Sequence, residues 1–241
     1  IRNAYRVHGG AMPILVSPDG KTRTDCYFLD AGEPDKALPL LRNVVSLSLT
    51  KRFGYHPIED IQVLTPMNRG TLGAANLNRE LQEALNPASP EKPELTHMHR
   101  VFRVGDKVIQ LKNNYDLDVF NGDIGIVRNV ETEDQEIVVE FPQGERVYQA
   151  ADLLDLAHAF AITVHKSQGS EYPAVVLVAT TQHYVMLQRN LLYTGMTRAR
   201  RTLVLMGNKR AVWIAVKNDR VQARWTLLAD LLRETYPERA K

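Results

Sequence analysis

Cysteine is nearly absent from this sequence, and no apolar run is long enough to cross a bilayer. The single cysteine, Cys26, cannot form an internal disulfide, which is typical of proteins from a reducing compartment. The longest apolar run, at 174–179, falls far short of the roughly 20 residues that a membrane-spanning helix needs. We therefore expect a cytoplasmic protein without a membrane segment.

A strong net charge of either sign is also lacking. The 241 residues carry 30 basic and 28 acidic side chains, a formal net charge of +2, so any surface that binds nucleic acid must be local. With 44% hydrophobic and 24% charged residues, the composition is that of a globular protein and excludes disordered, collagen-like and coiled-coil chains. Neither a methionine nor a signal peptide opens the sequence at Ile1, and we expect a fragment of a longer protein.

A proline-rich break divides the sequence. Pro87, Pro90 and Pro93 lie so close together that a helix or a central strand is excluded there. Upstream of the break, the spacing of apolar residues predicts strands at 26–29 and 61–65 and helices at 1–7, 37–51 and 70–85. These elements indicate mixed α/β structure over residues 1–97.

The character of the sequence changes to all-β after the break. Asn121-Gly122 is its strongest hairpin signal, and further turns are predicted at 133–135 and 142–144. With an extended run at 101–111, these turns predict four or five short strands. So few short strands favour a small β-barrel over a sandwich, and we place this barrel at residues 98–152.

Residues 153–241 return to the α/β pattern. Apolar strands without polar alternation are predicted at 160–164, 175–179 and 202–206, and a last helix at 221–232. Strands of this kind are typical of a parallel sheet that is buried on both faces. The economical interpretation is one α/β domain, made of residues 1–97 and 153–241, that carries the barrel as an insert.

The densest cluster of polar side chains is the segment 163–171, TVHKSQGSE, at the end of a predicted strand. Parallel sheets bind ligands at the carboxyl ends of their strands. The hydroxyls, imidazole and ammonium of this segment suit phosphates, and Gly169 allows close approach of the backbone. Glu171 suits a ribose hydroxyl better than an anion. The alternative interpretation is a solvated loop between a strand and a helix.

Two further polar clusters have the same ambiguity. Segment 193–201, YTGMTRARR, is predicted to be a helix that precedes the strand at 202–206, and a guanidinium there could stabilise charge on a transferred phosphoryl group. The alternative is a basic helix end that the helix dipole favours. Segment 65–70, TPMNRG, ends another strand, where Asn68 and Arg69 could contact backbone phosphates or simply form a turn.

Taken together, these clusters resemble the RecD-like branch of superfamily 1 DNA helicases. Segment 163–171 is similar to the family's motif V and 193–199 to its motif VI. The sequence before the family's barrel is similar to 63–70, 77–78 and 85–87, and its inserted SH3-like barrel to 102–108 and 120–125. The resemblance covers about 61–207.

The resemblance implies a RecA-like, P-loop NTPase-type parallel sheet, namely the second motor domain of such a helicase, with a small SH3-like barrel inserted. It implies that Arg198 is the catalytic residue that reaches the γ-phosphate of ATP. The other residues implied at the nucleotide are Gly169, Glu171 and Gln168, the last as a link between the two ligands. Residues implied near the DNA backbone are Thr163, His165, Lys166 and Ser167, with Asn68 and Arg69 as a looser match and Asn113 and Asn114 in a barrel loop.

A phosphate-binding loop of the Walker A type is missing. The segment 20–22, GKT, has the last residues of such a loop, but Leu15 stands where its first glycine belongs and Asp19 would face the phosphate, so we interpret it as a turn. We expect no metal site, because His97 and His99 have no further ligands nearby. Mg²⁺ and ATP are then held mainly by an N-terminal motor domain outside this sequence, and the fragment alone is expected to be inactive.

Three functions stay open at this point. The resemblance implies a monomer that couples ATP hydrolysis to 5′-to-3′ movement along single-stranded DNA and to unwinding, with its own N-terminal motor domain as partner. The second possibility is a stand-alone nucleic-acid-binding module that uses the barrel, without an ATPase role. The third is a fragment that docks a partner protein through the barrel.

Overall fold

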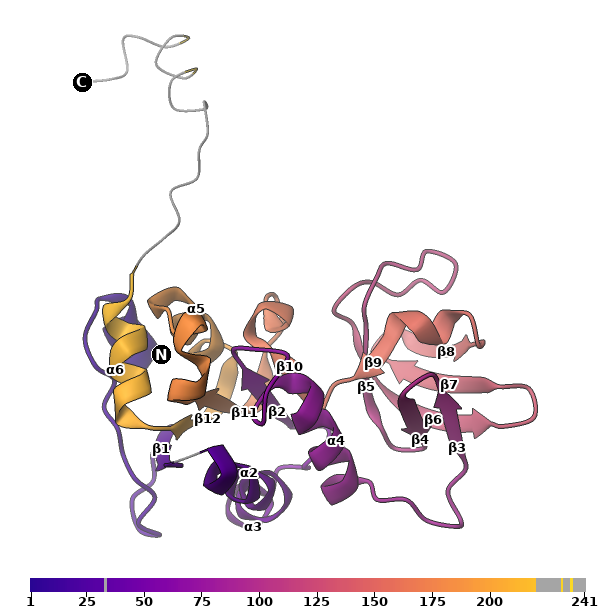
Figure 1. Ribbon diagram of the computed structural model, residues 1–241, viewed down its shortest axis with the longest axis horizontal. Helices are drawn as coiled ribbons and strands as arrows, with labels where there is room; N and C mark the ends of the chain where they lie inside the picture. The colour runs from indigo at the N-terminus through magenta and orange to yellow at the C-terminus, as the bar shows by residue number, and fades with distance from the viewer. Residues whose placement is uncertain (33, 220–230, 232–234, 236–241) are drawn as a thin grey trace.

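A five-stranded parallel sheet forms the larger of two lobes. The computed structural model describes residues 1–32, 34–219, 231 and 235. The strand order is β1-β12-β11-β2-β10, and every neighbouring pair is parallel (Figure 1). The strands are β1 (Cys26–Asp30), β2 (Ile61–Thr65), β10 (Ala161–Thr163), β11 (Tyr172–Ala179) and β12 (Ala199–Gly207). The parallel α/β sheet that the sequence predicted is confirmed.

Helices cover both faces of this sheet. One face carries α1 (Arg2–His8), α5 (Arg189–Met196) and α6 (Lys209–Lys217). The other face carries α2 (Pro34–Asn43), α3 (Leu49–Phe53) and α4 (Ala74–Leu85). A π-helical turn, η1 (Val44–Ser48), joins α2 to α3, so the helix predicted at 37–51 is one continuous helical stretch. No helix in the described part of the chain is long and apolar enough to cross a membrane.

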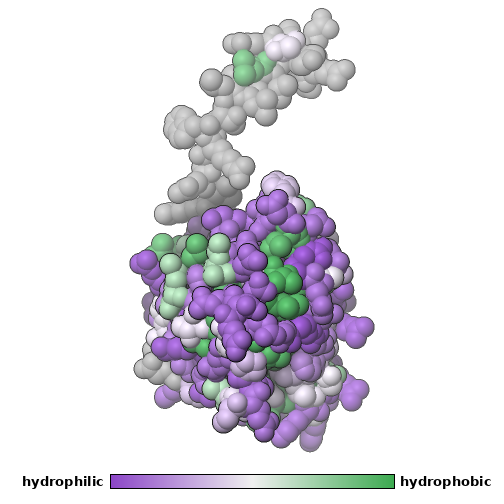
Figure 2. Space-filling view, turned by 90° about the vertical axis from the view of Figure 1, so that its right-hand side faces the viewer, coloured by the Kyte–Doolittle hydropathy of each residue, from purple (hydrophilic) through white to green (hydrophobic). Residues whose placement is uncertain are grey.

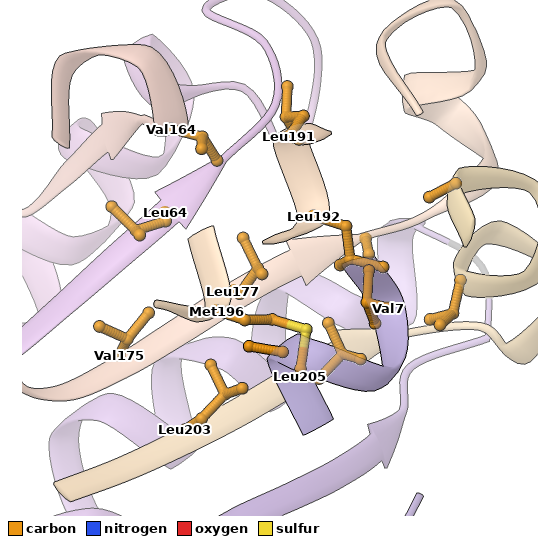
Figure 3. Close-up of a cluster of buried hydrophobic side chains, with 14 of the residues drawn as sticks. Val7, Leu64, Val164, Val175, Leu177, Leu191, Leu192, Met196, Leu203 and Leu205 are labelled. Carbon is orange, nitrogen blue, oxygen red and sulfur yellow. The ribbon is translucent and has the colours of Figure 1, made fainter. Parts of the chain in front are cut away.

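The central strand β11 shows why the sheet needs cover on both sides. Its side chains alternate, with Val175 and Leu177 in the core beneath α1, α5 and α6 (Figure 3) and Val176 and Val178 in the core on the α2–α4 side. All four are at most 1% exposed. Fully burying one such side chain stabilises the fold by about 1.5–3 kcal/mol, so a polar residue at any of these positions would be costly.

The smaller lobe is an antiparallel insert between α4 and β10 (Figure 1). Its main sheet has the order β8-β7-β6-β5-β9, beside a separate pair of strands, β3 and β4. Its own core includes Phe102, Val127 and Val139, while the face turned away from the larger lobe is mostly hydrophilic (Figure 2). The strands are β3 (Glu94–His97), β4 (Arg100–Arg103), β5 (Lys107–Gln110), β6 (Ile124–Glu131), β7 (Glu136–Phe141), β8 (Gly144–Tyr148) and β9 (Leu156–His158).

Several details differ from the sequence-based expectations. The extended run at 101–111 is interrupted by a turn at Gly105, whose φ of +92° suits glycine. Asn121-Gly122 closes a long loop instead of a tight hairpin, because the sharp reversal lies between Asn114 and Val119. The insert's strands run from 94 to 158, a few residues beyond 98–152 on each side, and the division into domains stays a prediction. The helix predicted at 221–232 falls largely outside the described residues.

Candidate functional site

The polar segment after β10 crosses the sheet from one edge to the other. Thr163 ends β10 beside Thr65, at the carboxyl edge, whereas Tyr172 starts β11 beside Ala199, at the amino edge. We call residues 164–171 the crossing loop; it begins with the 3₁₀ turn η3 (Val164–Ser167). The sequence placed this whole segment at the carboxyl edge, but only its first residues lie there. One loop therefore reaches both edges of the sheet.

Arg198 lies at the amino edge and faces the crossing loop. One of its terminal nitrogens donates to the carbonyl oxygen of Ser170 at 3.0 Å. Its Nε donates to the carbonyl oxygen of Thr194 at 3.2 Å, and its other terminal nitrogen to the hydroxyl of Thr197 at 3.2 Å. These bonds use three of the five N–H groups of a guanidinium. The half-buried side chain is thus held in place with donor capacity to spare.

The neighbouring crossing-loop residues are open to solvent. Gln168, Gly169 and Glu171 are exposed, and Gly169 has a φ of +86° that other residues rarely adopt. The Glu171 carboxylate accepts a hydrogen bond from Nε of Arg200 at 3.1 Å. Because both partners are exposed, this ion pair contributes little to stability. The structure therefore brings Gln168, Gly169, Glu171 and Arg198 together at one edge.

Small residues let α5 hold Arg198 against the sheet. A Cβ on Gly195 would lie 2.8 Å from Cδ1 of Leu177, so only glycine allows this approach of helix to strand. Met196, one residue further on, is buried in the core beneath α5 (Figure 3). A cavity of about 490 Å³ opens at the same edge, and its lining includes Arg2, Arg200 and Arg201. The amino edge thus offers several cations to an anionic ligand.

At the carboxyl edge, a tight turn follows β2. The Thr65 hydroxyl donates to the carbonyl oxygen of Leu72 at 2.7 Å and closes the turn. A Cβ on Gly73 would lie 2.4 Å from the carbonyl oxygen of Arg69, so glycine is required where the turn enters α4. Asn68 and Arg69 at the tip are exposed. The turn therefore presents both predicted side chains to solvent.

The first residues of the crossing loop differ in accessibility. Thr163 is half-buried, while His165 and Lys166 are exposed at the start of the loop. Ser167 is fully buried, and its hydroxyl donates to the carbonyl oxygen of Val164 at 2.7 Å. The Ser167 hydroxyl stabilises its own 3₁₀ turn, so the geometry gives no support to a DNA contact by this residue.

A basic residue of the insert, Arg100 on β4, lies near the crossing loop and was missed in the sequence. Its guanidinium donates to the carbonyl oxygen of Leu156 at 2.6 Å. The pKa of Lys166 is lowered by partial desolvation and by repulsion from Arg100. They come from segments far apart in the chain, and no sequence signal links them. The carboxyl-edge surface thus gains a cation from the insert.

A second missed segment is the 3₁₀ helix η4 (Thr181–Met186), which follows β11 at the carboxyl edge. A Cβ on Gly70 would lie 3.0 Å from Nε2 of Gln182, so η4 contacts the turn after β2. Burial of His183 lowers its pKa to about 4 and keeps it uncharged at neutral pH. Tyr184, by contrast, is 65% exposed. An exposed aromatic ring on a segment that contacts the turn after β2 is the kind of surface on which nucleic acid bases stack.

The barrel-loop asparagines have structural partners. Oδ1 of Asn114 accepts hydrogen bonds from the amides of Asp116 and Leu117, at 3.1 and 3.0 Å. Oδ1 of Asn113 accepts one from the amide of Asn121 at 3.0 Å. These contacts shape the loop between β5 and β6, and the structure does not bring Asn113 and Asn114 into contact with the crossing loop.

The segment that ends in Gly20-Lys21-Thr22 is a turn closed by its own acid. Oδ1 of Asp19 accepts hydrogen bonds from the amides of Lys21 and Thr22, at 2.9 and 2.6 Å, and the Thr22 hydroxyl donates to Oδ2. The Thr22 hydroxyl, with these amides, lowers the pKa of Asp19 to about 2. The segment is therefore a turn, as the sequence predicted.

Comparison with known proteins gives consistent matches to helicases. A model of the SH3 domain of ATP-dependent RecD-like DNA helicases matches residues 77–141, and a model of the UvrD-like helicase C-terminal domain matches 158–206. The ATP-dependent RecD2 DNA helicase of Deinococcus radiodurans is 38% identical over 173 residues, 72% of this chain and 23% of that protein. RecBCD enzyme subunit RecD of Haemophilus influenzae is 27% identical over 217 residues, 88% of this chain and 31% of that protein.

The chain spans about a quarter to a third of the length of these relatives. Among solved structures, the Pif1 helicase from Bacteroides in complex with ADP-AlF3 and ssDNA superposes with a TM-score of 0.49 at 14% identity, covering 99% of this chain and 54% of that chain. A superposition at this level supports no functional argument, so the assignment depends on the sequence matches.

Proposed function

Because the chain is the C-terminal region of a RecD-like superfamily 1 DNA helicase, we propose that it supplies one wall of an ATP site and part of a path for single-stranded DNA. The observation that carries the proposal is the position of Arg198. Its guanidinium lies at the amino edge, bonded to the crossing loop. The other wall, with the phosphate loop and Mg²⁺, belongs to the N-terminal motor domain of the same protein.

Arg198 stabilises charge on the γ-phosphate when the two motor domains close. Phosphoryl transfer in such enzymes depends mostly on positioning and electrostatics. The N–H groups of Arg198 that make no bond here reach the phosphate oxygens, while its bonds to Thr194 and Ser170 keep the side chain oriented. Gly169 and Gln168 approach the nucleotide from the crossing loop, and Glu171 suits a ribose hydroxyl once it leaves Arg200.

The carboxyl edge binds the DNA backbone. Arg69, Lys166 and His165 are exposed there, and Asn68 and Thr163 add polar groups. Contacts of this kind tolerate any sequence and weaken as salt rises. Since the crossing loop reaches both edges, closure over ATP changes its contacts with DNA, which is the differential interaction that coupling requires. The 5′-to-3′ direction follows from the family resemblance alone.

The decisive experiment is Arg198→Ala in the complete helicase. We expect turnover of ATP at saturating single-stranded DNA to fall about 10³-fold, on the scale of arginine fingers, with DNA affinity unchanged. Arg210→Ala removes an exposed arginine from α6 and serves as the matched control, with turnover within about twofold of the wild type. Normal turnover in the Arg198 variant would refute the assignment. The 241-residue chain alone should hydrolyse no ATP.

The alternative, a stand-alone nucleic-acid-binding module, has one observation in its favour. The insert has a hydrophobic core of its own. However, Ile109 of β5 packs in the core of the motor lobe, so the insert is joined to the motor and not merely tethered to it. Under this alternative, Arg198→Ala would leave every property of the complete protein unchanged. Monomeric state and cytoplasmic location stay predictions.

A further inference from the structure

Strand β5 of the insert has one face in each lobe. Successive side chains of a strand point to opposite faces. Val108 packs in the core of the insert, whereas Ile109 packs in the core of the motor. Gln110 turns back to the insert and accepts a hydrogen bond from the Tyr148 hydroxyl at 2.7 Å. Lys107, two residues before Ile109, therefore faces the motor.

The ammonium of Lys107 is buried between the lobes. The residue is 3% exposed, and its Nζ donates to the carbonyl oxygen of Ile61, the first residue of β2, at 3.2 Å. The same Nζ lies 5.8 Å from the centre of the Tyr172 ring. Among the described residues, Asp60 and Glu59 act on this ammonium only from beyond ion-pair distance. A buried cation with so few partners is costly for stability, so packing alone does not explain a lysine here.

Tyr172 connects this lysine to the nucleotide edge. It follows Glu171 directly and begins β11, and its amide donates to the carbonyl oxygen of Arg198 at 2.9 Å. Its ring is in the motor core, 7% exposed, and its hydroxyl lies near Ser170 and Arg198. The Lys107 ammonium therefore lies beside a ring that belongs to the first residue of β11.

We propose that Lys107 is a positioning residue for ATP hydrolysis: it holds Tyr172, which in turn fixes the backbone of Arg198 and of Ser170 at the nucleotide edge. The inference rests on the proposed function of Arg198. Its physical basis is a short series of contacts from the insert to the arginine, each between neighbouring groups. A force on the insert reaches the ATP site through this series.

Asp106, the residue before Lys107, prevents the insert from slipping relative to the motor. Its buried carboxylate accepts hydrogen bonds from Nε2 of Gln82 at 2.6 Å and from Nδ2 of Asn86 at 2.8 Å. Gln82 lies in the last turns of α4 and Asn86 caps that helix. Two adjacent residues thus attach β5 to the motor at two separate places. These attachments hold the Lys107 ammonium in place relative to Tyr172.

The test compares Lys107→Met, which keeps the length of the side chain and removes its charge, with Lys107→Arg, which keeps a charge. In the complete helicase we expect the methionine variant to lose about 10- to 100-fold in kcat for ATP at saturating single-stranded DNA, the scale of a misplaced catalytic group. KM for ATP and the DNA affinity should change less than about twofold, and arginine should restore part of kcat. Lys51→Met, at an exposed position of α3, is the control.

Stability separates positioning from a purely structural role. If Lys107 only supported the fold, the methionine variant would lose kcat together with its melting temperature. We expect the loss of kcat with an equal or higher melting temperature, because the substitution removes a buried charge. Tyr172→Leu should copy the kinetic defect, because it removes the ring beside the Lys107 ammonium. Tyr172→Phe keeps that ring and should show the smaller defect.

The controls separate this inference from the proposed function. An inactive Arg198→Ala protein together with a fully active Lys107→Met protein overturns the inference alone. If Arg198→Ala is itself fully active, the proposed function fails and the inference with it. If both hold, adding Lys107→Met to Arg198→Ala should cost little further kcat, because both act through one group. Full additivity of the two losses would overturn the inference.

Discussion

The burial of Lys107 has a measurable thermodynamic consequence. Desolvation lowers the pKa of Lys107 from its ordinary value of 10.5 to about 8, although Asp60 and Glu59 act in the opposite direction. A pKa shift of this size corresponds to about 3 kcal/mol. Since the folded pKa is the lower one, the unfolded chain binds more protons between pH 8 and 10.5. The penalty is therefore fully present below pH 8 and disappears as the pH rises through this window.

Lys107→Met should remove that pH dependence. The variant also leaves the carbonyl oxygen of Ile61 without its donor, at a cost of about 1–3 kcal/mol. At pH 7 the two effects nearly cancel, so we expect the variant to be as stable as the wild type or slightly more stable. By pH 10 the wild type should have lost most of this penalty of about 3 kcal/mol, so its free energy of unfolding should exceed that of the variant.

The assay is urea denaturation of the 241-residue chain at several pH values from 7 to 10. The quantity of interest is the difference in unfolding free energy between wild type and Lys107→Met, because titrating groups far from Lys107 cancel in it to first order. A difference that stays constant across this range would refute the view that Lys107 is a buried, poorly compensated cation.

Two further substitutions test the carboxyl edge. Gly73→Ala should destabilise the chain by about 1–3 kcal/mol in urea denaturation, because the new Cβ overlaps the carbonyl group of Arg69. Gly9→Ala is the control and should be neutral, because a Cβ there meets only ordinary contacts. Equal effects of the two substitutions would contradict the geometry. Tyr184→Ala should weaken the binding of single-stranded DNA by the complete helicase by about 1–3 kcal/mol, as loss of one stacked base does. Tyr5→Ala is the control, because Tyr5 is also 65% exposed, and a fluorescence titration in which both variants bind alike would exclude stacking on Tyr184.

The strands of the motor sheet could be predicted because strands buried on both faces are runs of consecutive apolar residues, and such runs are visible in the sequence. The run of apolar residues that forms β11 has no polar alternation, which suits only a strand covered on both faces. The turns that join β6 to β7 and β7 to β8 could also be predicted, from their residue composition. Arg198 faces the crossing loop, as the resemblance of the two segments to helicase motifs led us to expect.

Features that depend on contacts between distant segments could not be predicted. The approach of Arg100 to Lys166 arises from packing of the insert on the motor, and the sequence of neither residue signals it. From the sequence, Lys107 is expected to be a solvent-exposed polar residue of a strand. It is buried because the larger lobe packs against this face of β5. Ser167 looked like a ligand contact because the sequence does not reveal that a 3₁₀ turn would engage its hydroxyl.

The sharing of β5 between two hydrophobic cores limits how this protein can be taken apart. Removing the insert would take Ile109 out of the core of the larger lobe and leave the Ile61 carbonyl without the donor that Lys107 provides. The remaining lobe would expose apolar surface in the core that contains Leu64, and such surface promotes aggregation. The insert can therefore be removed or exchanged only together with the part of the larger lobe that packs against β5.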